Sequence, residues 1–131
     1  MTYALADHDG EVTLYTDGIS GKSPSLERLG QKISILIKSR SLDSLLEEKR
    51  IHSLDITKMD IEGTECIALK GAEKLLRSDH SPRSIFLEIH PNYLPKFGCS
   101  VEELEFYLLD CGYHVKSKSE RDFQVHVLLQ K

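Results

Sequence analysis

The alternation of apolar and polar residues divides the 131-residue chain into candidate strands and helices. Near the start, a short apolar run over residues 3–5 leads to the turn pair Asp9-Gly10. A strand-like run follows over residues 12–15, so this region predicts a hairpin. Residues 17–31 are rich in glycine, serine and proline and predict a loop. Isoleucines at every second position over residues 33–37 predict a further strand.

The middle of the chain alternates between strand patterns and helix patterns. Leucines on one face predict a helix over residues 42–50, with Ser41 as its N-cap. A short strand over residues 54–59 is followed by a helical pattern that extends to Leu76. The almost entirely apolar run over residues 84–89 (SIFLEI) predicts a strand that is buried on both faces.

The last third of the chain predicts one helix and two strands. Ser100 and Glu103 match a capping box at the start of the helix. Two strands over residues 113–115 and 123–129 are joined too tightly for a helical crossover, which predicts an antiparallel hairpin at a sheet edge. We find no internal repeat or boundary, so residues 1–131 are expected to form a single α/β domain.

Composition and charge narrow the classes of function. Apolar residues make up 40% of the chain, charged residues 29%, and the net charge is −4. An acidic chain argues against a nucleic acid or an anionic membrane as a partner held by bulk charge. No apolar run has the length of a membrane span and the N-terminus lacks a signal-peptide pattern, so we expect a cytoplasmic protein. The odd number of cysteines (Cys66, Cys99 and Cys111), without CxxC spacing, predicts free thiols, with Cys66 and Cys111 in the core.

Acidic residues gather where the predicted strands end. Asp60 follows the strand over residues 54–59, and Glu88 and His90 end the next strand. Because ligands of open α/β sheets bind outside the carboxyl ends of the strands, these three side chains converge on one crevice if the strands are neighbours. Glu62 and Glu65 lie in the first turn of the following helix, where the helix dipole favours acids without any function. Asp60 has the same alternative, as a simple helix cap.

Two further features bear on the chemistry of this crevice. Gly63 would let the backbone turn sharply or let a ligand approach closely. Glu88 interrupts an apolar strand, and a buried carboxylate needs a partner. Asp60 and Glu88 suit a hard cation. Two acids and one histidine without a third clear carboxylate are a weak metal pattern, however, so we assign no metal. The remaining histidines show no metal-ligand spacing and receive no role: His8, His52, His80, His114 and His126.

Four segments together resemble the FkbM family of S-adenosylmethionine-dependent methyltransferases. They are residues 42–46 (LDSLL), 58–65 (KMDIEGTE), 68–72 (ALKGA) and 86–90 (FLEIH). The opening residues and the late helix with its Gly-Tyr ending are also similar to this family, so the resemblance covers nearly the whole chain. It implies a class I methyltransferase fold, a seven-stranded sheet with helices on both faces. It also implies transfer of a methyl group to a hydroxyl oxygen of a sugar or natural product.

The resemblance assigns roles to the acidic motif. Asp60 corresponds to the acid at the end of the fourth strand, beside the site of methyl transfer, and is our first choice for contacting the acceptor. Glu88 and His90 are the supporting catalytic candidates. The rest of the same motif is expected to bind the substrate: Glu62, Gly63 and Glu65.

The chain departs from the family at the cofactor site. Family members have a glycine-rich turn after a strand, which holds the amino-acid end of S-adenosylmethionine, and an acid that holds the ribose hydroxyls. Here Gly10 and the glycines over residues 18–21 follow a hairpin and lead into a loop, which does not fit such a cradle. The sequence therefore resembles the C-terminal part of the family. We expect an incomplete class I (Rossmann-like) fold, with a mostly parallel sheet and a C-terminal antiparallel hairpin.

If the chain lacks the front strands of the family, we expect a physical consequence. In the class I order the fourth strand pairs with the first, so the strand that ends at Asp60 would have an unpaired edge, which invites another chain. We expect self-association or a partner chain at this edge, unless the N-terminal hairpin covers it. Two functions remain open. One is an O-methyltransferase for a small-molecule hydroxyl, using S-adenosylmethionine and weak or inactive alone. The other is a non-catalytic subunit or interaction domain that pairs with a separate cofactor-binding chain.

Overall fold

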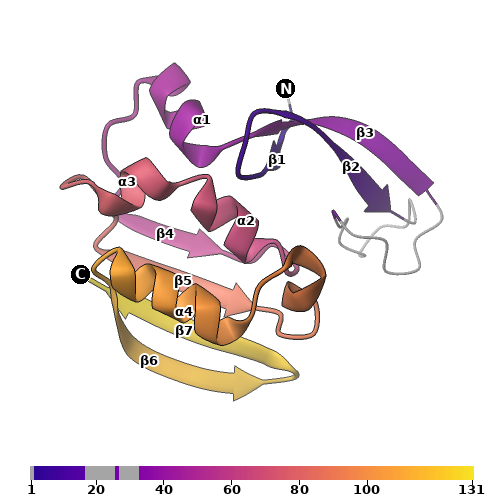
Figure 1. Ribbon diagram of the computed structural model, residues 1–131. Coiled ribbons are helices and arrows are strands. Elements are labelled where there is room, and N and C mark those ends of the chain that lie inside the picture. Colours follow the sequence, from indigo (N-terminus) through magenta and orange to yellow (C-terminus); the bar gives the residue numbers. More distant parts are fainter. Residues whose placement is uncertain (1, 17–25, 27–32) are drawn as a thin grey trace.

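The computed structural model describes residues 2–16, 26 and 33–131, which form two β-sheets with helices packed against one of them (Figure 1). The strands are β1 (Ala4–Leu5), β2 (Gly10–Thr16), β3 (Ile33–Arg40), β4 (Ile56–Met59), β5 (Ser84–Ile89), β6 (His114–Arg121) and β7 (Gln124–Gln130). The helices are α1 (Leu42–Lys49), α2 (Glu65–Lys70), α3 (Glu73–Arg77), the 3-10 turn η1 (Leu94–Phe97) and α4 (Val101–Asp110). Apart from residue 26, the loop expected over residues 17–31 lies outside the described residues.

The first sheet has the order β1-β3-β2, so the hairpin expected between the first two strands is wrong. β1 pairs in parallel with β3, whereas β2 pairs with β3 in antiparallel register from Gly10↔Ser39 to Thr16↔Ile33. The Asp9 carboxylate accepts a hydrogen bond from the Ser41 amide, 2.9 Å away. This contact holds the Asp9-Gly10 turn against the start of α1, and β3 lies between the two strands that the turn separates.

The second sheet has the order β4-β5-β7-β6 and is mixed. β4 and β5 are parallel, whereas β7 is antiparallel to both β5 and β6. The expectation of a mostly parallel sheet is therefore wrong, because the C-terminal hairpin contributes half of the strands; the α/β class and the hairpin are confirmed. β4 lies at one edge, and no strand in the described part of the chain pairs with its outer side, as expected.

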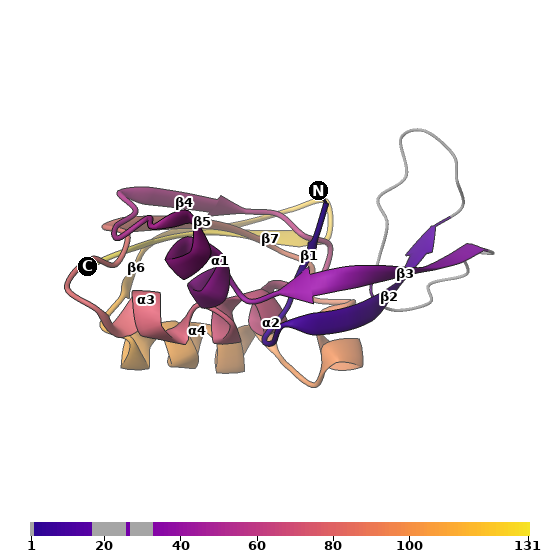
Figure 2. The ribbon, with the colours of Figure 1, turned by 90° about the horizontal axis from the view of Figure 1, so that it is seen from above.

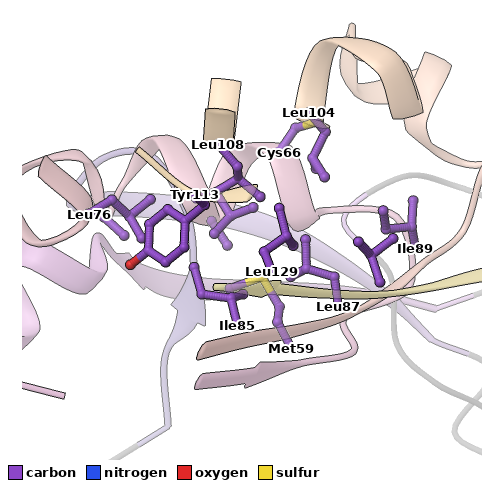
Figure 3. Packing of buried hydrophobic residues seen from close by; sticks show 14 of the residues in the cluster. Met59, Cys66, Leu76, Ile85, Leu87, Ile89, Leu104, Leu108, Tyr113 and Leu129 are labelled. Carbon is purple, nitrogen blue, oxygen red and sulfur yellow. The ribbon is translucent and has the colours of Figure 1, made fainter. Parts of the chain in front are cut away.

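Helices α2, α3 and α4 cover one face of this four-stranded sheet, and Figure 2 shows no described helix on the opposite face. Ile85, Leu87 and Ile89 of β5 point into the core at 0–3% exposure. Phe86, on the other face, is 45% exposed, so the expected burial of β5 on both faces is wrong. In the core, these side chains pack against residues from the helices and against Tyr113 (Figure 3). The Tyr113 hydroxyl donates a hydrogen bond to the Pro82 carbonyl at 2.7 Å.

The single helix expected after Gly63 is divided into α2 and α3. Gly71 lies at the break, where a Cβ atom would come closer than 3.0 Å to the Ala6 carbonyl oxygen, so the chain after β1 passes directly against it. Asp43 caps the second piece, because its carboxylate accepts hydrogen bonds from the Lys74 and Leu75 amides at 2.9 and 3.0 Å. The expected N-cap of α1, Ser41, is confirmed.

In the C-terminal part, the predicted N-cap of α4 is confirmed and the strand β6 is longer than predicted. The capping box of α4 is present, with Glu103 N donating to Ser100 Oγ at 3.2 Å and Ser100 N to Glu103 Oε2 at 2.9 Å. β6 is longer than expected and includes most of the charged segment that was assigned to a turn. All its residues are exposed, so no apolar alternation marks it as a strand.

The cysteines differ in part from the expectation of three free thiols. Cys66 and Cys99 form a disulfide, with Cα atoms 6.5 Å apart, so the prediction is wrong for this pair. Cys111 is free and buried, and burial raises the pKa of its thiol. No helix within the described ranges combines the length and the apolar character that crossing a bilayer requires.

Candidate functional site

The carboxyl ends of β4 and β5 bring the predicted residues together. The two strands are parallel neighbours with Met59 opposite Leu87, so the residues that follow them meet at one edge of the sheet. Asp60, Glu88 and His90 each place one side-chain oxygen or nitrogen within 4.8 Å of the others. The convergence predicted from the sequence is confirmed. We refer to these three side chains as the strand-end triad.

His90 is the buried member of the triad, with a side chain that is 8% exposed. Its Nδ1 lies 3.2 Å from Glu65 Oε1, while its Nε2 lies 3.9 Å from Asp60 Oδ1 and 3.5 Å from Glu62 Oε2. The Tyr93 ring stacks on the imidazole, with centroids 6.0 Å apart and planes inclined by 11°. In a neutral His90, the contact with the Glu65 carboxylate places the proton on Nδ1 and leaves the Nε2 lone pair on the side of the other acids.

Glu65 lies behind His90 rather than in the open part of the crevice. It is fully buried in the first turn of α2, and its Oε1 also accepts a hydrogen bond from the Gly63 amide at 3.1 Å. Its Oε2 has no hydrogen-bond partner in the described part of the molecule. A carboxylate buried at a helix N-terminus, bonded to an amide and to an imidazole, is suited to fixing the orientation of that imidazole.

Gly63 is required by the close approach of two loops. Its φ is +98°, and a Cβ atom there would lie closer than 3.0 Å to the Cβ of Tyr93. Glu62 also has a positive φ, of 56°. The tight turn after β4 is thereby held against the loop that follows β5, so that its acids face the His90 ring.

Glu88 lies on the side of the sheet that no described helix covers. It pairs across the sheet with His126 of β7, and its Oε2 is 4.0 Å from His126 Nε2. Both residues line a cavity of about 220 Å³, together with Lys58 and Phe86. The Glu88 side chain is 25% exposed and is therefore accessible to a small ligand.

Sequence reasoning missed three residues around the triad: Tyr93, His126 and Gln124. The Gln124 side-chain amide lies 3.2 Å from His90 Nε2. Tyr93 stands in the segment HPNYLP directly after the strand, and an aromatic residue so close to His90 was a usable signal. Gln124 and His126 reach the site only through the pairing of β5 with β7, which no local pattern reveals.

The electrostatic balance of the site is strongly negative. Asp60, Glu62 and Glu65 each pair with His90 and with no other cationic group in the described ranges. Glu88 has only the distant contact with His126. Four carboxylates thus gather around one deeply buried imidazole, with no lysine or arginine within ion-pair distance among the described residues.

Comparison with known proteins identifies one family. The model of the methyltransferase FkbM domain matches residues 1–115, which is most of the chain. The matched region contains the strand-end triad, Glu62, Gly63 and Glu65, whereas Gln124 and His126 lie beyond it. Searches of curated proteins and of solved structures returned no significant match.

Proposed function

The chain belongs to the FkbM methyltransferase domain family, and from this premise we propose that it forms the acceptor side of an S-adenosylmethionine-dependent O-methyltransferase. The acceptor is a hydroxyl group of a sugar or natural product. The observation that carries the proposal is the convergence of Asp60, Glu88 and His90 at the carboxyl ends of two parallel strands. Ligands of α/β sheets bind at such ends.

The described residues offer a site for an acceptor but no cradle for the cofactor. No glycine-rich turn joins a strand to a helix in the described ranges, which is what the amino-acid end of S-adenosylmethionine requires. When bound, this cofactor supplies the methyl group. We propose that its cradle comes from another chain. The order β4-β5-β7-β6 supports an incomplete class I (Rossmann-like) sheet.

The triad supplies what a hydroxyl acceptor needs. A hydroxyl becomes a better nucleophile when a base accepts its proton. Asp60, with a side chain that is 38% exposed, is positioned to accept a hydrogen bond from the acceptor hydroxyl and to take its proton. His90 Nε2, 3.9 Å away, is the second acceptor for this proton. Glu88, on β5, places a further carboxylate near Asp60 and His90 in the same crevice.

The other residues of the motif divide by exposure. Glu62 is 36% exposed and contacts further polar groups of the substrate in this proposal. Gly63 and Glu65 are buried, so they act on the substrate indirectly, through the turn that they shape and through the orientation of His90.

Calorimetric titration of S-adenosylmethionine into the purified chain tests the cofactor half of the proposal. We expect no heat of binding for the chain alone. Clear micromolar binding would overturn this account, because the chain would then build the cradle from residues assigned to other roles.

A methyl-transfer assay tests the acceptor half. The chain is combined with a cofactor-binding partner that restores activity and is given sugars or other polyhydroxylated acceptors. We expect Asp60→Asn to lower kcat by about 100-fold or more, the contribution of a positioned base. Asp79→Asn, at an exposed acid away from the crevice, is the matched control. Unchanged turnover in Asp60→Asn would refute the role of Asp60.

The second candidate function is a non-catalytic subunit or interaction domain. It is favoured by the outer edge of β4, which pairs with no described strand. We propose that a strand of another chain pairs there, either from a second copy or from a separate cofactor-binding chain. Light scattering of the purified chain separates the cases. A stable monomer at all concentrations would exclude self-association. Unchanged partner binding by Asp60→Ala, with no methyl transfer by the unaltered chain either, would favour the non-catalytic function.

The expected cytoplasmic location also remains part of this proposal. A reducing compartment would hold Cys66 and Cys99 as thiols in the cell. Because both cysteines are buried, cells are quenched with acid and alkylated under denaturing conditions without reductant; mass spectrometry should then find both cysteines labelled. Labelling only after reduction of the lysate would contradict a cytoplasmic location.

A further inference from the structure

The strand-end triad brings together three side chains that could hold a metal ion. The three candidate ligand atoms lie within 4.8 Å of one another. Ligands at about 2.0–2.3 Å from a common ion are separated by up to about 4.5 Å, so small side-chain rotations would bring these atoms into coordination. Asp60 and Glu88 are partly exposed and are free to make such rotations.

A second and independent observation is the orientation of the buried His90. Its Nδ1 is fixed by Glu65, a fully buried carboxylate whose other bonded contact is the Gly63 amide. Its Nε2 therefore faces the acids of the crevice. Histidines that bind metals are commonly held in this way by a carboxylate on the ring nitrogen that does not bind the ion. The Gln124 amide lies 3.2 Å from Nε2, and a bound ion would take its place.

The charge of the crevice points in the same direction. Glu62 and Glu65 add two carboxylates to those of the triad, and no lysine or arginine of the described residues pairs with any of the four acids. Carboxylates brought this close repel one another unless a cation lies between them. Glu62 Oε2, 3.5 Å from His90 Nε2, is within reach as a fourth ligand.

We propose that Asp60, Glu88 and His90 bind one divalent cation, with Glu65 as the residue that positions His90. Carboxylate oxygens with a single imidazole nitrogen suit a manganese-like transition metal better than Ca²⁺, which takes oxygen ligands alone. With the ion bound, His90 Nε2 is a ligand and no longer accepts a proton. The exposed side of Asp60 leaves room for a hydroxyl ligand, whose pKa the ion would lower in place of that role. This use of the ion rests on the proposed function, whereas binding of the ion does not.

Titration of the purified chain with MnCl₂, followed by electron paramagnetic resonance of the free ion, tests the proposal without cofactor or acceptor. We expect one bound ion per chain. Asp60→Asn and Glu88→Gln should each weaken binding by about 10-fold or more. Glu65→Gln, which keeps the shape but removes the charge behind His90, should weaken it by about 10- to 100-fold. Asp79→Asn should bind as the unaltered chain does.

The outcomes separate this inference from the proposed function. A free Mn²⁺ signal that is undiminished by the chain would overturn the metal site, and so would equal binding by Asp60→Asn, Glu88→Gln and the control. Circular dichroism checks that each variant is folded; Asp60 and Glu88 are chosen because both side chains are partly exposed and lie outside the hydrophobic core. Mn²⁺ binding together with unchanged turnover of Asp60→Asn in the reconstituted methyl-transfer assay would count against the proposed function and leave the metal site standing.

Discussion

Gly63 offers the sharpest test of how the crevice is held together. Replacing it with alanine has two costs. A φ of +98° is unfavourable for an L-residue, at about 1–2 kcal/mol. The added Cβ would also meet the Tyr93 Cβ at less than 3.0 Å, and relief of such overpacking typically costs about 1–3 kcal/mol. We therefore expect Gly63→Ala to lower the free energy of unfolding by about 2–5 kcal/mol.

The chain supplies a matched control for the first of these costs. Gly98 also has a positive φ, of +69°, but a Cβ atom there would have no neighbour within 4 Å. Gly98→Ala should cost only the backbone part, about 1–2 kcal/mol. The difference between the two variants isolates the contact between Gly63 and Tyr93.

Urea denaturation followed by circular dichroism measures both variants under the same conditions, with the m-value as a check that each still unfolds in two states. Equal losses in the two variants would refute the argument, because the contact with Tyr93 would then carry no cost. A loss below about 1 kcal/mol in Gly63→Ala would refute the backbone argument as well. Since Tyr93 stacks on His90, we also expect Gly63→Ala to impair Mn²⁺ binding more than Gly98→Ala does.

Three further predictions concern stability. Removing the disulfide by replacing both Cys66 and Cys99 with serine should lower the free energy of unfolding by about 3–4 kcal/mol, which is the loop-closure entropy for a sequence separation of 33. A melting curve of the unaltered chain that does not change when reductant is added would contradict this expectation. Asp43→Ala should cost about 1–2 kcal/mol in urea denaturation, because α3 loses the acceptor for two amides; Asp43→Asn should recover part of this. Hydrogen bonds from the Ser44 hydroxyl and the Ser41 amide lower the pKa of Asp9 from its ordinary value of 3.8. The Asp9 carboxylate therefore stabilises the fold fully above pH 3.8, and this contribution is lost as the pH falls through the lowered pKa. Asp9→Asn should accordingly make the free energy of unfolding less dependent on pH in acid.

The sequence predicted correctly those features that depend on residues close together in the chain. The N-cap at Ser41, the capping box at Ser100 and the bounds of β5 all follow from neighbouring residues, and all are confirmed. Errors arose where distant segments decide the outcome. β3 separates β1 from β2 despite a strong turn signal. The helix expected after Gly63 is interrupted at Gly71, where the distant backbone of Ala6 lies directly against the chain.

The candidate site shows the same division. The rule that ligands bind at strand ends was sufficient to bring Asp60, Glu88 and His90 together, because it needs only the adjacency of two parallel strands. The contact of Gln124 with His90 spans 34 residues and depends on an antiparallel pairing that the sequence does not mark. The pairing of Cys66 with Cys99 was equally hidden, because three cysteines without a known spacing do not indicate which two meet.

The disulfide also gives the crevice an unusual connectivity. Cys66 directly follows Glu65, and Cys99 directly follows the loop and turn after β5, so the chain between them is a covalently closed ring. Glu88, His90 and Tyr93 all belong to this ring. A protease that cuts any single peptide bond inside it would leave both pieces attached, with the residues around His90 still joined to α2. While the disulfide is intact, two cuts in the chain are needed to release a segment of this ring from α2. Once the disulfide is reduced to two thiols, a single cut is enough.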